Sequence, residues 1–318
     1  MKYNILGNTG LKVSALSYGA SPLGGVFGAI DEKEGIRTVH KALDLGVNLV
    51  DVSPYYGNTV AESVLGKAIK TAQRDSFILS SKAGRYGPDF ADFDFSESRI
   101  RKSLEESLNR LNTDYLDIFL LHDIEFASLT QIFSESLPAL HALKKEGKVR
   151  FVGVTGYPVR IFEETVKNDS NIDVVLTYCR YGLHDQTLLR CLPSLATKGI
   201  GVINASPTAM GVLTDNGAPD WHPASTAFLE TARKARSLCQ KKGVNITQLA
   251  MQYATGHSDI ASTLVGTACP HKMGQNVDWI NQPIDSALLD EVLSLFNTID
   301  CTWPSGHTEN QDKSHIEN

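Results

Sequence analysis

Hydrophobic residues recur along this chain in short continuous runs that alternate with longer amphipathic stretches. Each run has the length of a buried strand, and each stretch spaces its apolar residues three or four positions apart, as one face of a helix does. Ile100, Leu104, Leu108 and Leu111 mark such a face. The pattern predicts strands at residues 16–20, 47–51, 77–82, 115–122, 149–155, 172–177, 201–205 and 262–265.

Helical periodicity fills the intervals between these predicted strands. The expected helices cover 31–45, 60–72, a long stretch that opens at Ser96, 129–146, 158–168, 186–197, 225–242, a stretch from Thr247, 270–279 and 285–297. Before the first strand, the turn signal Gly7-Asn-Thr-Gly10 lies between two short strand-like pieces. Residues 1–15 are therefore expected to form a β-hairpin.

Eight strand–helix units without a break in composition favour a single α/β domain over residues 1–318. A doubly wound sheet would need fewer strands and a G-x-G-x-x-G turn, which is absent. The count instead predicts a (β/α)8 TIM barrel with extra helices, its base plugged by the N-terminal hairpin. Residues 303–318 are polar and are expected to form a loose tail.

Composition excludes several classes of function. A net charge of -6 with scattered basic residues gives no reason to expect nucleic acid. No apolar run approaches the roughly 18 residues of a membrane span. Five cysteines, an odd number with no metal-ligand spacing, and no N-terminal apolar segment are typical of a reducing, cytoplasmic compartment. Neither a monomer nor a homodimer is favoured.

Four polar residues with catalytic potential lie where predicted strands end. Asp51, Lys82 and His122 close three successive strands, and Tyr56 follows the first of them. The carboxyl ends of barrel strands converge on one face, so these side chains are expected to meet. A charged Lys82 would favour the phenolate of Tyr56, and Asp51 would keep Lys82 charged. Singly, each residue has a structural reading, such as a turn aspartate or a satisfied histidine.

Taken together and in this order, the four residues resemble the catalytic tetrad of the aldo-keto reductases. The stretch 143–150 and the segment Gly153-Val-Thr-Gly156 support the resemblance, which covers residues 5 to about 280. It implies that a nicotinamide exchanges a hydride with the substrate while Tyr56 transfers the proton. Within the family, segments 51–57 and 175–183 are most similar to members that act on a small-molecule sugar. They imply oxidation of L-galactose at C1 to its 1,4-lactone.

The resemblance also implies a set of cofactor contacts at the ends of the strands. These are Gly19, Ala20, Ser21, Asp51, Thr155, Gly156, Tyr178, Ser206, Pro207, Thr208, Met210, Gly266, Thr267, Lys272, Gln275 and Asn276. Thr155-Gly156 and Tyr178 depart from the Ser-Asn and Gln that usually hold the nicotinamide carboxamide; Tyr178 could stack on the ring instead. The run 266–273 has Lys272 as its only fixed cation, which predicts NAD rather than NADP.

The substrate pocket is expected to be built from loops beyond the strands. Its predicted walls are Tyr55, Tyr56, Tyr86, His122, Tyr181 and Trp221. Other aldoses or aldehydes, or a regulatory role as a nicotinamide-binding subunit, remain alternatives. A metal-dependent hydrolase is disfavoured because His122 alone among the histidines ends a strand, and no metal is expected. Cys179 could be a redox-sensitive thiol or a small core residue.

Overall fold

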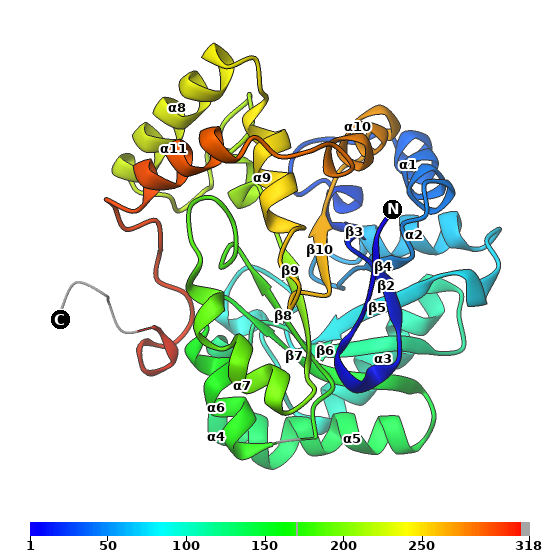
Figure 1. Cartoon of the computed structure of the whole chain (residues 1–318). Coiled ribbons are helices and arrows are strands. Elements are labelled where there is room, and N and C mark those ends of the chain that lie inside the picture. Colours follow the sequence, from blue (N-terminus) through cyan, green and yellow to red (C-terminus); the bar gives the residue numbers. More distant parts are fainter. Residues whose placement is uncertain (170, 313–318) are drawn as a thin grey trace.

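A closed barrel of eight parallel strands forms the centre of the computed structural model, which describes residues 1–169 and 171–312 (Figure 1). The strands neighbour one another around the barrel in chain order, and the last pairs with the first. They are β3 (Leu16–Gly19), β4 (Leu49–Asp51), β5 (Ile78–Ala83), β6 (Leu116–Leu121), β7 (Val149–Gly156), β8 (Val174–Tyr178), β9 (Gly201–Ala205) and β10 (Ser262–Val265). The predicted (β/α)8 barrel is confirmed.

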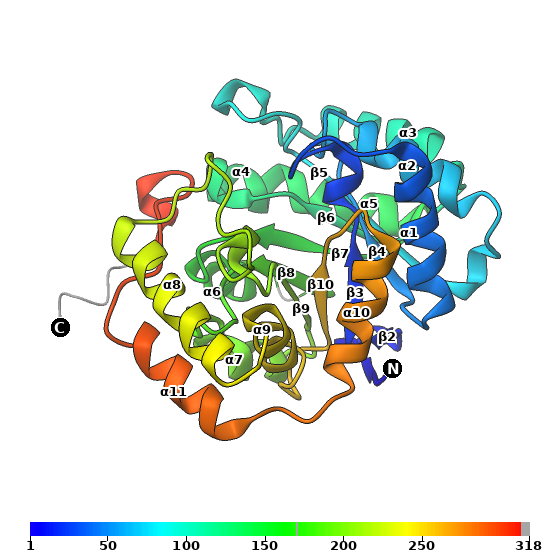
Figure 2. The same cartoon turned by 90° about the horizontal axis from the view of Figure 1, so that it is seen from above.

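Helices surround the barrel, as the view from above shows (Figure 2). They are α1 (Glu32–Asp44), α2 (Val60–Ile69), α3 (Glu97–Leu111), α4 (Leu129–Gln131), α5 (Leu137–Lys145), α6 (Arg160–Asn168), α7 (Leu192–Thr197), α8 (Thr226–Lys241), α9 (Ile246–Ala254), α10 (Pro270–Ile280) and α11 (Ser286–Phe296). The expected helix 129–146 is divided by a wider turn at Ile132–Ser136. Within the described residues, no helix is long and apolar enough to cross a membrane.

The predicted hairpin is present as β1 (Tyr3–Ile5) and β2 (Lys12–Ser14), which pair antiparallel. Leu6, Leu11 and Val13 of this region belong to one buried cluster with side chains that fill the barrel interior, such as Leu49 and Ile78. The hairpin therefore closes the base of the barrel and leaves the opposite end, where the strands finish, for chemistry.

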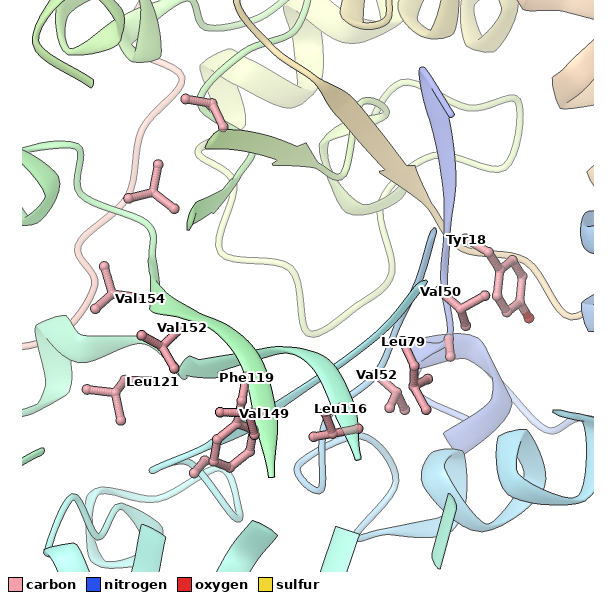
Figure 3. Close-up of a cluster of buried hydrophobic side chains, with 14 of the residues drawn as sticks. Tyr18, Val50, Val52, Leu79, Leu116, Phe119, Leu121, Val149, Val152 and Val154 are labelled. Carbon is pink, nitrogen blue, oxygen red and sulfur yellow. The ribbon is translucent and has the colours of Figure 1, made fainter. Parts of the chain in front are cut away.

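Between the barrel and the helices lies the largest buried apolar cluster. Figure 3 shows part of it, with Val50, Leu79, Phe119 and Val152 among the labelled side chains. Alternate strand residues therefore serve two apolar layers, one inside the barrel and one against the helices. Because both faces are apolar, the polar side chains that could do chemistry are concentrated at the strand ends.

The segment after α11 packs onto the barrel, so the expected loose tail is wrong for residues 303–312. Trp303 stacks on Tyr157 with 4.5 Å between ring centroids. Asn310 is buried and donates to the backbone carbonyls of Glu125 and Ala127. The rest of the expected tail, residues 313–318, lies outside the described residues.

Asp312 fixes the far end of this segment. Its carboxylate accepts from the backbone N–H groups of Val159 and Arg160 at the start of α6. It also pairs with Arg180, whose side chain is 1% exposed, at 2.6 Å. The polar composition of this segment suggested a loose tail. The expectation failed because these polar groups form hydrogen bonds to buried groups of the barrel rather than to water.

Candidate active site

Three neighbouring strands bring the predicted tetrad together. Asp51 is the last residue of β4 and is in register with Ser80 of β5, and Lys82 lies two residues further along β5. His122 directly follows β6, and its backbone N–H donates to Ala83 at the end of β5. The parallel register thus places the Asp, Lys and His side chains at the same end of the barrel.

Tyr56 is placed by a tight turn after β4. Gly57, the next residue, has φ +61°, a conformation that suits glycine. A side chain there would overlap the backbone of Gly24, in the loop after β3. Close packing of these two loops holds the Tyr56 ring beside that of His122. The two ring centroids are 5.7 Å apart, and the ring planes are nearly perpendicular.

Lys82 is the central cation of the group and is 1% exposed. Its ammonium donates to the Asp51 carboxylate, to the Val52 carbonyl at 2.9 Å and to the Tyr56 hydroxyl at 3.5 Å. Asp51 also accepts from Ser80 Oγ at 2.7 Å. Burial opposes the charge of Lys82, but the attraction of Asp51 and Tyr56 outweighs burial and raises the pKa of the ammonium.

Burial dominates the titration of Tyr56. It raises the pKa of the phenol to about 12, although the nearby charge of Lys82 lowers it and that of Asp51 raises it further. The sequence predicted the lowering by Lys82 but not the larger effect of burial. Tyr56 is therefore a phenol at neutral pH, and the cation beside it reduces the cost of forming the phenolate.

His122 is a neutral imidazole. Burial lowers its pKa to about 3, with Asp123 opposing the shift and Lys82 and Arg85 adding to it. Ser53 Oγ lies 2.9 Å from its Nδ1. Its Nε2 lies 3.8 Å from the nearer carboxylate oxygen of Asp123, beyond hydrogen-bonding distance. Nε2 therefore remains available to a bound substrate.

Asp123 and Arg85 form a second buried ion pair beside His122, which sequence reasoning missed. Arg85 donates to Asp123 at 2.6 Å, and its guanidinium lies 3.8 Å from the centroid of the Tyr55 ring. The backbone of Asp123 adopts φ +57°, which is uncommon for a residue other than glycine. The place of Asp123 directly after His122 in the sequence was a signal for the site.

The predicted pocket walls divide into two groups. Tyr55 and Tyr56 lie beside His122. Trp221 is 50% exposed, and its ring centroid lies 5.7 Å from that of Phe27, in the loop after β3. The other two predicted wall residues pack against side chains of the outer helices. The Tyr86 ring packs under Arg99 of α3, and the Tyr181 ring stacks on Tyr253 of α9. Both rings therefore point toward the outer helices.

The residues predicted to contact a dinucleotide lie along the same end of the barrel. Gly19 of β3 pairs with Asp51, and the N–H of Ala20, followed by Ser21, donates to the Asp51 carbonyl. Ser206, Pro207, Thr208 and Met210 follow β9, and Gly266 and Thr267 follow β10. Lys272, Gln275 and Asn276 lie on α10.

The local geometry of these segments fits a dinucleotide. Ser206 and Met210 have φ +57° and +49°, so the backbone of this loop is held in an uncommon shape. The first turn of α10 contains no acidic residue, and its N-cap Cys269 makes no side-chain cap. Free N–H groups at a helix N-terminus suit a phosphate group.

Thr155, Gly156 and Tyr178 occupy the expected strand ends but have partners of their own. Thr155 Oγ1 accepts from the N–H of Asp123 at 2.9 Å and lies 3.2 Å from the carboxylate of the same residue. A side chain at Gly156 would overlap Ile161 and the Glu125 carboxylate. The glycine is therefore explained by packing against Glu125. Burial raises the pKa of Tyr178 well above its ordinary value.

Two further buried groups, Glu125 and Arg180, lie under the segment 301–312. Glu125 accepts from the N–H of Tyr157 and from Ser305 Oγ. Burial, reinforced by the charge of Asp123, raises the pKa of its carboxyl to about 8. Arg180 pairs with Asp185 and Asp312. Sequence reasoning missed both, because neither belongs to the tetrad motif.

Cys179 is buried, and burial raises the pKa of its thiol well above the ordinary range. Such a thiol carries little thiolate, so the role of a small core residue is favoured over redox sensing. Among residues 1–169 and 171–312, no group of three or more His, Cys, Asp or Glu side chains is arranged to hold a metal ion.

Comparisons with known proteins agree with this arrangement. Residues 15–295 match the Aldo/keto reductase family. The chain is 48% identical over 314 residues to L-galactose dehydrogenase from Arabidopsis thaliana, covering 96% of this chain and 98% of that protein. It is 33% identical over 240 residues to D-arabinose 1-dehydrogenase from Saccharomyces cerevisiae, covering 70% of each chain.

The fold is similar to that of a solved aldo-keto reductase from Bacillus halodurans in its holo form. The TM-score is 0.79, with 24% sequence identity, and the match covers 98% of this chain and 100% of the other. Fold, site geometry and sequence similarity lead to the same conclusion: the chain belongs to the aldo/keto reductase family and is an oxidoreductase that uses a nicotinamide cofactor.

Proposed function

We propose that this chain oxidises L-galactose at C1 to L-galactono-1,4-lactone with NAD as the hydride acceptor. The observation that carries the proposal is the similarity to the Arabidopsis L-galactose dehydrogenase along nearly the whole chain. The same resemblance points to a role in ascorbate biosynthesis. The tetrad geometry supplies groups that suit the chemistry.

Tyr56 is proposed to receive the proton of the C1 hydroxyl. Its hydroxyl lies 3.5 Å from the ammonium of Lys82, which stabilises the phenolate that must form before the proton can be taken. Asp51 holds Lys82 in place and balances its charge in the buried site. Because the pKa of Tyr56 is about 12, oxidation is expected to accelerate as the pH rises through the alkaline range.

His122 is proposed to orient the oxygen on C1. Its free Nε2 is the group that can hydrogen-bond this oxygen while Tyr56 takes the proton. A nicotinamide bound at this site would accept the hydride from C1 while Tyr56 takes the proton of the C1 hydroxyl, so that C1 would become a carbonyl carbon.

The groups around the tetrad suit a sugar. Tyr55 and Trp221 offer aromatic faces to the apolar side of a sugar ring. Arg85 and Asp123 add a donor and an acceptor next to His122, and these can bond sugar hydroxyl groups. A simple aldehyde would leave this pair without a ligand partner. The combination therefore favours a polyhydroxy substrate.

NAD is favoured over NADP by the scarcity of cations near α10. Lys272 is the one Lys or Arg in the run 266–273, and the loop 210–223 contains neither. Lys41 of α1 also lies beside α10, but Asp278 shares that groove. A buried 2′-phosphate needs paired cations, whereas the 2′-hydroxyl of NAD does not. Comparing kcat/KM for the two cofactors tests this, and a clear preference for NADP would overturn it.

The substrate is tested by incubating the purified chain with NAD and a panel of aldoses and aldehydes, and following formation of reduced cofactor. We expect L-galactose to give the highest kcat/KM and its lactone to be the product by mass spectrometry. If another aldose or an aldehyde is turned over and L-galactose is not, the substrate assignment fails. The Tyr56→Phe variant in the same panel shows whether turnover belongs to this site.

A further inference from the structure

Ser53 lies behind the imidazole of His122, on the opposite ring nitrogen from the one available to substrate. It follows β4 by two residues and is completely buried. Its Oγ is 2.9 Å from His122 Nδ1. A hydrogen bond at this ring nitrogen decides which of the two nitrogens carries the proton of a neutral imidazole.

The direction of this hydrogen bond follows from counting protons. Ser53 has one hydroxyl proton and two acceptor lone pairs. The backbone N–H of Tyr55 donates to Oγ at 3.1 Å, which occupies a lone pair and leaves the proton free. Across the described part of the chain, His122 Nδ1 is the only other hydrogen-bond partner of this oxygen. The Ser53 proton therefore points at Nδ1, which must be unprotonated.

The opposite arrangement would leave a buried donor without a partner. If His122 Nδ1 carried the proton and donated it to Ser53, the hydroxyl proton of Ser53 would have no acceptor in a position closed to water. Unsatisfied buried donors are strongly disfavoured. Asp123 adds to the preference, since its carboxylate lies 3.8 Å from Nε2 and attracts a proton on that atom.

We infer that Ser53 is a positioning residue that holds His122 as the Nε2–H tautomer, so that His122 donates a hydrogen bond to the oxygen on the reacting carbon. The catalytic half of this inference rests on the proposed function. The tautomer itself does not, because it can be measured in the protein without substrate.

Nitrogen-15 NMR of histidine-labelled protein tests the tautomer directly. Long-range proton–nitrogen spectra distinguish a protonated from an unprotonated ring nitrogen, and comparison with His122→Asn identifies His122 among the nine histidines. We expect Nε2 to be protonated and Nδ1 unprotonated at neutral pH. A protonated Nδ1, or a signal averaged between the two tautomers, would overturn the inference.

Ser53→Ala tests the role of the hydroxyl, and Ser81→Ala is the matched control. Ser81 is also fully buried and donates one hydrogen bond, to Glu62 at 2.7 Å, away from His122. We expect Ser53→Ala to give a mixture of His122 tautomers and a kcat about tenfold lower, equivalent to about 1.4 kcal/mol. Ser81→Ala should leave both unchanged.

The two proposals fail in distinguishable ways. If no aldose is oxidised but the spectrum shows Nε2–H, the proposed substrate falls and the tautomer assignment stands. If Ser53→Ala retains the wild-type tautomer and kcat, Ser53 is not the residue that sets the tautomer. If this variant does not fold, the wild-type spectrum still decides the direction of the Ser53–His122 hydrogen bond.

Discussion

Asp123 and Glu125 are two buried carboxyl groups on the same turn, yet they face two different regions of the barrel mouth. Asp123 faces the tetrad and pairs with Arg85. Glu125 faces the segment 301–312 and, within residues 1–169 and 171–312, has no cation as a partner. The pKa of Asp123 is lowered, because the charge of Arg85 and the hydrogen bonds from Arg85 and Thr155 oppose the effect of burial, whereas that of Glu125 is raised to about 8.

The comparison shows that the partner, and not burial alone, decides the charge of a buried acid. On the tetrad side, Asp51 and Asp123 each have a cation within bonding distance. On the side covered by residues 301–312, a neutral carboxyl is held by a backbone N–H and a hydroxyl. The mouth therefore combines a charged wall, suited to proton transfer, with a wall that buries a carboxyl group of raised pKa.

The largest expected effect concerns chemistry on the charged wall. Tyr56→Phe removes the proposed proton-transfer group and keeps the ring, so kcat should fall by about 10²–10⁴-fold. The dissociation constant for NAD, measured by calorimetry, should stay close to that of the wild type. Turnover near the wild-type value in this variant would remove Tyr56 from the mechanism.

Next in size is the stability of the charged wall itself. Lys82→Met leaves Asp51 buried beside Ser80 without its cation, so the free energy of unfolding should fall by about 3–5 kcal/mol. Adding Asp51→Asn should recover part of the loss. Urea unfolding measures both. Residual oxidation by Lys82→Met should require a higher pH, because the cation that favours the Tyr56 phenolate is gone. An unchanged pH–rate profile would contradict this role.

Glu125→Gln should change how stability depends on pH. The folded chain keeps the Glu125 proton up to about pH 8, whereas an unfolded glutamate loses it near 4.3. Between these values the folded state binds more protons, so this group makes wild-type stability fall as pH rises, by at most about 1.4 kcal/mol per pH unit. As the pH rises across this range, the free energy of unfolding of the variant, measured with urea, should therefore increase relative to that of the wild type.

Asp123→Asn is the opposite control for Glu125→Gln. The lowered pKa of Asp123 means that its ionised form stabilises the fold above the pKa of an unfolded aspartate, and that this contribution is lost as the pH falls. This variant should therefore be less stable than the wild type at neutral pH. If Glu125→Gln failed to gain stability relative to the wild type as the pH rises, or if Asp123→Asn were as stable as the wild type at neutral pH, the division of the mouth into two walls would be wrong.

The smallest effect is expected where the segment 301–312 is anchored. Asp312→Asn weakens the bond to Arg180 but can still accept from the N–H groups at the start of α6. The free energy needed to detach this segment from the barrel is expected to fall by about 1–3 kcal/mol. Protease cleavage within residues 301–312, followed by mass spectrometry, should accelerate. Glu309→Gln, an exposed change on the same segment, should not accelerate it.

The barrel could be predicted from sequence because strands buried on both faces give continuous apolar runs. The predicted run 201–205 coincides with β9, and 262–265 with β10. The convergence of Asp51, Lys82 and His122 followed from parallel register, which brings the strand ends to one face. Tyr56 could be added because its turn is only five residues beyond β4.

Side-chain direction beyond the strand ends could not be predicted in this way. Tyr181 follows β8 closely, but the backbone turns at Cys179, with φ +60°, and its ring packs on α9. Ser53 lies within the segment 51–57, but the hydrogen bond between its hydroxyl and His122 can be seen only in the folded structure. The packing of residues 303–312 was invisible because it depends on buried partners, such as Arg180, that are distant in sequence.

The order in which the chain is synthesised gives the segment 301–312 a particular consequence. It leaves the ribosome after all eight barrel strands, so a nascent chain can contain the whole barrel before Asp312 reaches Arg180 or Ser305 reaches Glu125. One wall of the mouth is thus completed last. Premature termination after α11 would yield a barrel that retains the tetrad but lacks that wall. Arg180 and Glu125 would then be left without Asp312 and Ser305 as partners, and quality control in the cell would act on a nearly complete barrel.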